Sequence, residues 1–332
     1  MAIRMAQYGT KHGHAAGKGQ AMQTNPDVEF VGVFEPDPEA RARARRHPAY
    51  AGVCWYESAE EMLGDERIVA VAIEGRNDES LAMAQAAIAA GKHLWFDKPA
   101  GDDWFTFLDV IGIARANSLH VQMGYMFRYH DGFNQIAEWT RVGLLGEIFM
   151  VRAHMSTWIS VEAREVISRH QGGIFYDLAG HMIDQIVWLL GRPRRVTAFF
   201  RNDATPEVPA FVDNTLGVFE FDRAMAFVDI AAMEARPMAR RFEVYGTRGS
   251  AIMEPFEPAR SIRLCLEEAS GGYAAGEQIL PLSVPSRQEL YERELKAFVA
   301  TLQGAQPPDR SLYHEVLVQE TLLRATGGIT TE

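Results

Sequence analysis

The chain has 332 residues, of which 47% are hydrophobic and 23% are charged, so disordered and low-complexity classes are excluded. At about 150 residues per domain, this length predicts two domains. The 44 acidic and 33 basic residues give a formal net charge of −11. Because phosphate binding needs a basic face, we expect neither nucleic acid nor an anionic membrane among the partners.

Two further features bound the class of protein. The two cysteines, Cys54 and Cys265, are too few for a disulfide framework or a four-thiolate metal site. No run approaches the roughly 18 apolar residues that span a bilayer. The segment Met1–Tyr8 is short, is interrupted by Arg4, and lacks the cleavage site of a secretory signal. We therefore expect a cytoplasmic protein.

The first third of the chain alternates apolar runs with helical patterns. The predicted strands are residues 3–8, 28–34, 53–56, 68–73, 93–96 and 120–124. Continuous apolar runs of this length are typical of strands buried on both faces. Regular alternation of strand and helix predicts a parallel sheet with helices on both faces. We assign this first domain to residues 1–123.

The remainder, residues 124–332, reads differently. It begins with a long amphipathic helix at 173–190 and ends with helices at 287–302 and 312–326. Between them lie the predicted strands 194–201, 214–222, 225–234, 241–245, 251–254 and 262–267. Short turns between such runs predict an open, mostly antiparallel sheet with helices on one face. The fold class is therefore α/β.

The turn after the first strand contains glycine, and such a turn can hold a dinucleotide diphosphate. The pattern Gly-x-Gly-x-x-Gly would place glycine at 9, 11 and 14, whereas the chain has Gly9, Lys11, Gly13 and His14. A tight turn without a ligand is the alternative interpretation. Glu35 ends the second strand, where a carboxylate can accept hydrogen bonds from an adenosine ribose and repel a 2′-phosphate. NAD is therefore favoured over NADP, and Lys11 could attract phosphate as a point charge.

Three polar residues are candidates for chemistry. Lys98 follows a buried-looking strand at the carboxyl edge of the sheet, where ligands bind in open α/β folds, although most lysines are simply exposed. Asp177 and His181 are four residues apart, so they share one face of the predicted helix. They either tie two elements together, or His181 is a general base beside a carboxylate that orients a hydroxylated substrate. No cluster has metal-ligand spacing, so no catalytic metal is expected.

Four motifs, taken in order, resemble those of the Gfo/Idh/MocA family of oxidoreductases, the relatives of glucose–fructose oxidoreductase and inositol dehydrogenase. They are the 9–14 turn with Glu35-Pro36-Asp37-Pro38, Asp97-Lys98-Pro99 after Ala90-Gly91-Lys92-His93, Met126-Phe127-Arg128-Tyr129 with 143–148, and Gly172-Gly173 with Asp177-Leu178-Ala179-Gly180-His181 and Asp184. The chain departs from the family pattern at three places. Lys11 stands where the pattern has its middle glycine, and Asp97 stands where it has glutamate. Arg76 lies in a segment that lacks a histidine found in many relatives.

The resemblance implies a Rossmann domain, and an α/β domain whose open sheet forms a homodimer or homotetramer. It implies hydride transfer between a nicotinamide cofactor and a carbinol of a sugar, polyol or glycoside. Lys98 would contact the substrate hydroxyl and the nicotinamide ribose, Asp177 a neighbouring hydroxyl, and His181 would take the hydroxyl proton. Two alternatives remain: a redox-assisted glycoside lyase or hydrolase that retains NAD, and a non-catalytic sugar or dinucleotide sensor.

The predicted site residues fall into two sets, with Lys98, Asp177 and His181 as the catalytic residues. The expected cofactor contacts are Gly9, Thr10, Lys11, His12, Gly13, His14, Glu35, Arg76, Asn77, Asp97 and Lys98. The expected contacts of a small hydroxylated substrate are Lys98, Tyr125, Phe127, Arg128, Trp158, Arg164, Asp177 and His181.

Overall fold

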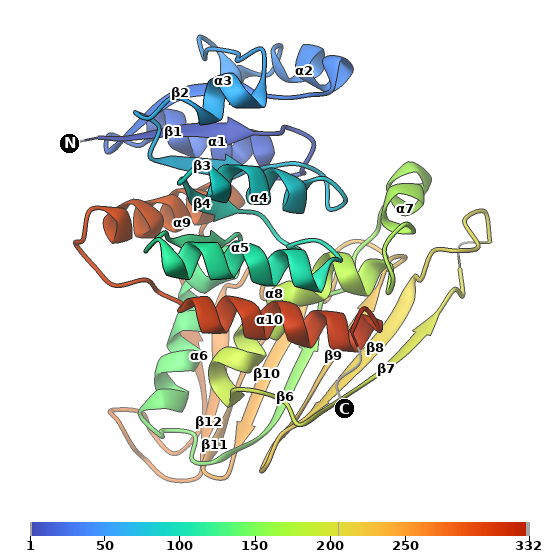
Figure 1. Cartoon of the computed structure of the whole chain (residues 1–332). Coiled ribbons are helices and arrows are strands. Elements are labelled where there is room, and N and C mark those ends of the chain that lie inside the picture. Colours follow the sequence, from blue (N-terminus) through green and yellow to red (C-terminus); the bar gives the residue numbers. More distant parts are fainter. Residues whose placement is uncertain (1, 205, 330–332) are drawn as a thin grey trace. The chain divides into compact units, whose positions relative to one another are not determined.

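The computed structural model describes residues 2–204 and 206–329, and the chain divides into two units (Figure 1). Unit 1 comprises Met1–Met126 and Ser286–Val316, and unit 2 comprises Phe127–Pro285 and Leu317–Glu332. The boundary predicted after residue 123 lies close to the first crossing between the units. Residues 286–316, which the sequence places in the second domain, pack instead with unit 1.

Unit 1 is built on a parallel sheet, as predicted, and the structure shows the strand order β2-β1-β3-β4-β5. Its strands are β1 (Ile3–Tyr8), β2 (Val28–Phe34), β3 (Ala70–Ile73), β4 (His93–Phe96) and β5 (Val121–Met123). All four residues of β3 are buried, which is why its sequence is continuously apolar. The strand predicted at 53–56 is wrong, because this segment makes only a single bridge, between Trp55 and Val33.

The helices of unit 1 begin at clear sequence signals. They are α1 (Ala15–Thr24), α2 (Pro38–Ala44), α3 (Ala59–Leu63), α4 (Ser80–Ala89), α5 (Trp104–Ala116), α9 (Arg287–Leu302) and the short η1 (Pro48–Tyr50). Asp37 caps α2 through the backbone N–H groups of Glu39 and Ala40, and Ser58 caps α3. Helix α1 packs against α9, and α4 packs against α5.

Three contacts explain why the segment 286–316 belongs to unit 1. The ring of Tyr291 lies so close to α1 that a Cβ at Gly17 would come within 2.7 Å of it. The Gln122 side chain donates a hydrogen bond of 3.0 Å to the carbonyl of Glu294. The backbone N–H of Met123 donates to the Glu315 carboxylate at 3.3 Å. The returning segment thus covers the α1 side of the sheet and its β5 edge.

Strand β1 lies between β2 and β3, so the chain leaves it in one direction and later returns on its other side. Such a reversal of strand order opens a crevice at the carboxyl ends of the strands, where α/β proteins bind ligands. The residues after β1, β2 and β3 meet at this edge. The fold therefore places the 9–14 turn at the ligand-binding end of unit 1.

Unit 2 contains an eight-stranded sheet with the order β13-β12-β11-β10-β6-β9-β8-β7. Its strands are β6 (Ile148–His154), β7 (Arg195–Arg201), β8 (Asn214–Glu220), β9 (Met225–Ala231), β10 (Arg241–Gly246), β11 (Gly249–Met253), β12 (Ser261–Leu266) and β13 (Gly276–Pro281). The predicted antiparallel character is confirmed, and β6 and β9 form a parallel pair within it. Strands β6 and β13 were not predicted.

The helical elements of unit 2 are α6 (Asp131–Arg141), α7 (Val161–Ile167), α8 (Ile174–Leu190), the short η2 (Met126–Tyr129) and the later turns of α10 (Leu312–Thr326). Helix α8 packs on β6, β8 and β9, and on α6. It therefore covers one face of the sheet, as predicted. On the opposite face the side chains are half-buried or exposed, as the alternating burial of β8 and β9 shows.

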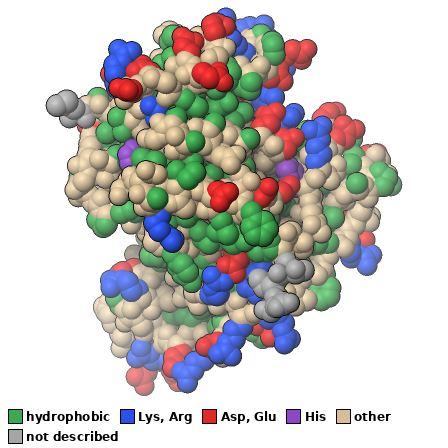
Figure 2. Space-filling view, viewed as in Figure 1, with side chains coloured by type: hydrophobic (Ala, Val, Ile, Leu, Met, Phe, Trp, Pro, Cys, Tyr) green, Lys and Arg blue, Asp and Glu red, His purple; other side chains and the backbone are tan. Residues whose placement is uncertain are grey.

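No helix within residues 2–204 and 206–329 has the length and apolar character to cross a membrane. On the face of the molecule shown in Figure 2, acidic and basic side chains are intermingled.

Candidate active site

The turn after β1 forms one wall of a cavity of about 440 Å³ in unit 1. The lining residues are Thr10, Lys11, His12, Gly13, Ala16, Asp37, Ala40, Arg43, Ala44, His47, Tyr50 and Arg76. Gly9 has a φ of +87°, and a Cβ there would lie 2.7 Å from the backbone nitrogen of Gly75. Only glycine fits this close crossing of two backbones. The turn leads directly into α1, whose N-terminal N–H groups favour an anion.

Glu35 is only 1% exposed and is not among the residues that line this cavity. One of its oxygens accepts hydrogen bonds from the backbone N–H of Thr10 at 2.6 Å and from its hydroxyl at 2.8 Å. The other accepts from the backbone N–H of Asp37 at 3.0 Å. In this arrangement Glu35 ties the turn after β1 to the end of β2. The contact of Glu35 with an adenosine ribose stays a prediction. What the structure shows is the link that Glu35 makes between the turn and the end of β2.

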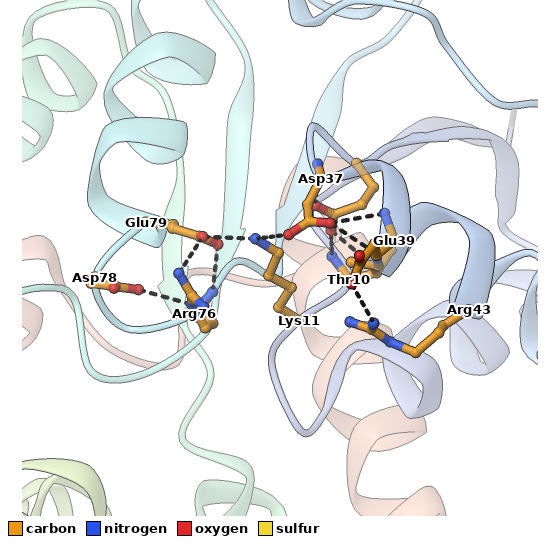
Figure 3. A network of polar contacts seen from close by, with 10 residues as sticks. Thr10, Lys11, Asp37, Glu39, Arg43, Arg76, Asp78 and Glu79 are labelled. Carbon is orange, nitrogen blue, oxygen red and sulfur yellow. Dashed lines mark hydrogen bonds and ion pairs between the residues drawn. The ribbon is translucent and has the colours of Figure 1, made fainter. Parts of the chain in front are cut away.

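Lys11 connects the loops on either side of β1 (Figure 3). Its Nζ lies 3.1 Å from Asp37 Oδ2 and 2.8 Å from Glu79 Oε1. Burial alone would lower the pKa of Lys11, but hydrogen bonds to Glu79 and Asp37 raise it above its ordinary value. Backbone hydrogen bonding at Ala40 and the hydrogen bond from Lys11 lower the pKa of Asp37 to about 2. Lysine and carboxylate are therefore both charged at neutral pH.

Arg76 belongs to the same network. Its guanidinium is 3.1 Å from Asp78 and 2.8 Å from Glu79, in the turn between β3 and α4 that also contains Asn77. The predicted cofactor residues Thr10, Lys11, His12, Gly13 and Arg76 thus share one cavity. Asp37, Arg43 and His47 also line it but were not predicted.

A second cluster of charged residues lies deeper in unit 1, around the predicted residue Asp97. Lys18 Nζ is 3.1 Å from Asp97 Oδ2 and 3.2 Å from Glu74 Oε1, and the three side chains are at most 2% exposed. The Nδ1 atoms of His12 and His14 lie 3.1 Å and 2.9 Å from the same Asp97 oxygen. Lys18 and Glu74 were not predicted. The sequence did contain a signal for Lys18, because it follows His14 by one helical turn and therefore lies on the same face of α1.

The two carboxyl groups of this cluster, Glu74 and Asp97, have pKa values that are shifted in opposite directions. Burial raises the pKa of Glu74 well above its usual value, and the Lys18 ammonium only partly opposes this. Burial also acts to raise the pKa of Asp97, but His12, His14 and Lys18 outweigh it and hold that pKa well below its usual range. Burial lowers the pKa of His14 to about 4. These opposite directions make Asp97 a stronger acid than Glu74 within the cluster.

Donor atoms of His12, His14 and Asp97 lie within 4.8 Å of one another, a grouping that a metal ion could use. The Lys18 ammonium, however, already lies against the same Asp97 oxygen. A divalent cation there would face an uncompensated neighbouring positive charge, so the donor set favours the lysine.

Lys98 lies two residues after the end of β4, at the carboxyl edge of the sheet, and is 4% exposed. Its backbone N–H donates to Asp97 Oδ1 at 2.7 Å. Asp97 therefore links the Lys98 backbone to the buried cluster, one oxygen for each. This hydrogen bond fixes the backbone of Lys98 at the edge of the sheet.

The predicted pair Asp177 and His181 lies in unit 2, on the first two turns of α8. His181 is 2% exposed, and its ring meets the ring of Phe127 edge-on, with 5.2 Å between centroids. The helix begins at Gly173, where φ is +52° and a Cβ would lie 2.5 Å from the carbonyl oxygen of Val212. Asp177 in the first turn also interacts favourably with the helix dipole.

The other predicted substrate contacts divide by burial. Tyr125, in unit 1, and Phe127, in unit 2, are at most 1% exposed and pack as core. Arg128 is 3% exposed and forms an ion pair with Asp184, and its contact with substrate stays a prediction. Arg164 is 7% exposed and pairs with Glu207 at 3.0 Å. Trp158 is 50% exposed.

Two family models match the chain. One, described as an oxidoreductase family with an NAD-binding Rossmann fold, matches residues 5–125, and the other, described as a GFO/IDH/MocA C-terminal domain, matches residues 133–252. The uncharacterized oxidoreductase YhhX of Escherichia coli is 25% identical over 256 residues, or 74% of this chain and 71% of its own.

Solved structures share the whole fold. An NAD binding oxidoreductase from Klebsiella pneumoniae superposes with a TM-score of 0.84 at 17% identity, covering 99% of this chain and 97% of its own. UDP-N-acetylglucosamine 3-dehydrogenase GnnA from Acidithiobacillus ferrooxidans gives a TM-score of 0.81 at 18% identity, covering 99% and 98%. At these identities the likeness shows the fold alone.

Proposed function

Because the chain belongs to the GFO/IDH/MocA family of oxidoreductases, we propose that it is an NAD-dependent dehydrogenase acting on a carbinol of a sugar, polyol or glycoside. The observation that carries the proposal is the pairing of a carboxylate and an imidazole, Asp177 and His181, one turn apart on α8. GnnA, which shares the fold, is by name a dehydrogenase of a sugar nucleotide. That name supports a carbohydrate-like substrate.

The residues around the unit 1 cavity fit a dinucleotide. Gly9 lets the turn pass close to the Gly75 backbone, α1 offers its N-terminus, and Lys11 and Arg76 on the cavity wall offer positive charge. When bound, the nicotinamide ring supplies the hydride acceptor or donor. A carboxylate at the end of β2 would disfavour a 2′-phosphate, which is why we propose NAD over NADP.

Each predicted catalytic residue has one task in this proposal. His181 takes the proton of the reacting hydroxyl, because a neutral imidazole is an effective base near neutral pH. Asp177 accepts a hydrogen bond from a neighbouring hydroxyl and orients the sugar ring. Lys98 donates to the reacting oxygen from the carboxyl edge of the unit 1 sheet. Orientation and general-base help together supply the acceleration.

We also propose that two or four copies assemble through the open face of the unit 2 sheet. Phe199 on β7 pairs with Leu216 on β8, and Val218 on β8 pairs with Phe227 on β9. Leu216 and Val218 are two residues apart on one strand, so all four side chains share a face. An apolar group on a sheet face is a suitable contact for a second copy.

The test of the proposed reaction is a screen of sugars, polyols and glycosides with NAD, followed at the absorbance of NADH. We expect His181→Asn to lower turnover by about 10² to 10⁴, and Lys98→Met to lower it as well. The control is Lys296→Met, which removes an exposed lysine of α9 in the same unit as Lys98. Thermal unfolding of each variant verifies that the fold is retained.

The yield of NADH separates the proposed reaction from its alternatives. A dehydrogenase forms one NADH for each substrate oxidised. Cleavage of a glycoside without net NADH would instead identify a redox-assisted lyase or hydrolase. Dinucleotide binding without turnover on any hydroxylated compound would identify a sensor. Unchanged activity in both His181→Asn and Lys98→Met would refute the proposed roles.

A further inference from the structure

The least expected residue of the turn is Lys11, which stands where the family pattern has glycine. Its side chain is only 12% exposed, because its ammonium is held between two carboxylates. Asp37 belongs to the loop after β2, and Glu79 precedes α4 in the loop after β3. The lysine thus bridges the two sides of the β1 strand-order reversal, across the end of the sheet where a ligand is expected.

The two bridging contacts lie at the cavity where the proposed function expects a dinucleotide diphosphate. Lys11 and Asp37 both line the cavity of about 440 Å³, together with the turn and the first residues of α1. A diphosphate held by that helix N-terminus and turn lies against the same wall. An ammonium already paired with carboxylates is in position to pair with phosphate oxygens instead.

Two carboxylates near the end of β2 differ in what they can offer a ligand. Glu35 is enclosed, and backbone or hydroxyl donors already bind both of its oxygens. Asp37 has a side chain that is 39% exposed. Its Oδ1 caps α2, through the N–H groups of Glu39 and Ala40, and its Oδ2 binds Lys11. Release of Lys11 would therefore leave one Asp37 oxygen facing the cavity.

We propose that Lys11 exchanges partners when a dinucleotide binds. Its ammonium leaves Asp37 and Glu79 for the diphosphate oxygens, and the released Asp37 Oδ2 accepts hydrogen bonds from the adenosine ribose hydroxyls. Asp37, and not Glu35, is then the residue that selects NAD over NADP. This inference rests on the proposed function, since it concerns the dinucleotide of that same site.

The exchange leaves each charged group with a polar partner. In the free protein, two carboxylates neutralise Lys11 and part of Arg76, which also binds Glu79. In the complex, Lys11 pairs with the diphosphate, Glu79 keeps Arg76, and Asp37 exchanges an ammonium for hydroxyl donors. A 2′-phosphate would stand beside Asp37 with like charge and no intervening lysine.

The first experiment measures dissociation constants for NAD and NADP by calorimetry with the whole chain. Asp37→Asn keeps the oxygen that caps α2 and removes the charge, and asparagine is as good a cap as aspartate. We expect this variant to bind NAD about tenfold more weakly, since a hydrogen bond to a charged group is lost, and to lose most of its preference over NADP. Glu35→Gln should keep the preference of the wild type.

The second experiment uses pyrophosphate as the probe of the exchange itself. Glu79→Gln removes one competitor for the ammonium, so pyrophosphate and NAD should both bind a few-fold more tightly, a rough estimate for a partly exposed ion pair. Lys11→Met should weaken both. The matched control is Glu57→Gln, which removes an exposed carboxylate that pairs with Arg41 away from the cavity. It should change neither affinity.

The outcomes separate this inference from the function on which it rests. If the wild type binds neither NAD nor NADP, the proposed function fails and the inference fails with it. If NAD binds but the preference over NADP disappears in Glu35→Gln and persists in Asp37→Asn, only the inference fails, and Glu35 is the ribose contact. Weaker pyrophosphate binding in Glu79→Gln would show that the lysine bridge is structural and would overturn the exchange.

Discussion

Arg128 and Asp184 form an ion pair inside unit 2, with side chains that are 1% and 0% exposed. Arg128 Nη2 lies 2.6 Å and Nε 2.9 Å from Asp184 Oδ1, and the other carboxylate oxygen accepts a hydrogen bond from Gln185 at 3.0 Å. Asp184 is on α8, the helix that carries the proposed catalytic pair, and Arg128 is on η2. The arginine therefore anchors that helix.

We predict that Asp184→Asn is strongly destabilising, because it leaves the buried Arg128 charge without its counter-charge. Breaking a buried pair in this way costs about 3 to 5 kcal/mol of unfolding free energy. Urea unfolding followed by circular dichroism measures it. The control is Glu138→Gln, which breaks an exposed pair with Arg141 and should cost less than about 1 kcal/mol. An equal loss of unfolding free energy in the two variants would contradict the expected role of the buried Arg128–Asp184 pair.

The buried cluster of unit 1 gives a second prediction, about where its proton resides. Since the pKa of Glu74 is raised by burial, glutamine resembles the protonated acid, and Glu74→Gln should change the free energy of unfolding by less than about 1 kcal/mol. Lys18→Met leaves Asp97 without its cation and should cost about 3 to 5 kcal/mol. If Glu74→Gln proves as costly as Lys18→Met, Glu74 is ionised in the folded protein.

The fold was predictable where a short run rich in apolar residues is bounded by turn residues. The strand predicted at 93–96 is β4 residue for residue, and that at 28–34 is β2. Strand β6, at the centre of the second sheet, was missed because its open face carries Arg152 and His154, which interrupt the apolar run. Helical periodicity also predicted α9, but periodicity does not indicate on which domain a helix packs. For α9 the domain is determined by tertiary contacts, such as that of Tyr291 with Gly17.

The site was predictable where motifs mark the ends of strands. Asp97 and Lys98 were placed correctly after β4, but the partners Lys18 and Glu74 come from elements that meet only in three dimensions. Glu35 and Asp37 also show that the sequence does not reveal which partners a side chain meets in three dimensions. The sequence favoured Glu35 as the ribose contact, whereas the hydrogen bonds from Thr10 and from the backbone enclose it.

The depressed pKa of His14 predicts a loss of stability in mild acid. The unfolded chain takes up this proton near pH 6.5, whereas the folded protein does so only near pH 4. Between these values the unfolded state binds more protons, so stability is complete above about pH 6.5 and falls as the pH is lowered towards 4. At 1.36 kcal/mol per pKa unit, the total loss is about 3 kcal/mol.

His14→Asn tests this pH dependence, because asparagine can donate to Asp97 without titrating. The measured quantity is the slope of the unfolding free energy against pH between about 6.5 and 4. This slope reports how many protons the chain takes up on unfolding, and we expect the variant to take up about one proton fewer. His93, whose pKa burial also lowers to about 4, contributes in the same window and remains in both proteins. An unchanged slope would show that His14 titrates normally in the folded chain.

The proposed assembly through the open face of unit 2 gives a last prediction. Phe199 is 59% exposed beside Leu216, and Met225 is 50% exposed on the neighbouring β9. A second copy seated there would remove this apolar surface from water. We expect Leu216→Glu combined with Val218→Glu to convert a dimer or tetramer into single chains, measured by size exclusion with light scattering, because buried glutamates would oppose one another across the contact.

The control for the assembly is an equally exposed apolar residue elsewhere. Phe105 on α5 of unit 1 is 76% exposed, so Phe105→Glu adds the same charge away from the sheet and should leave the mass unchanged. Dissociation by Phe105→Glu, with the sheet variant still assembled, would move the contact to unit 1. A wild type that elutes as a single chain at every concentration would mean that the open face of the unit 2 sheet remains in water.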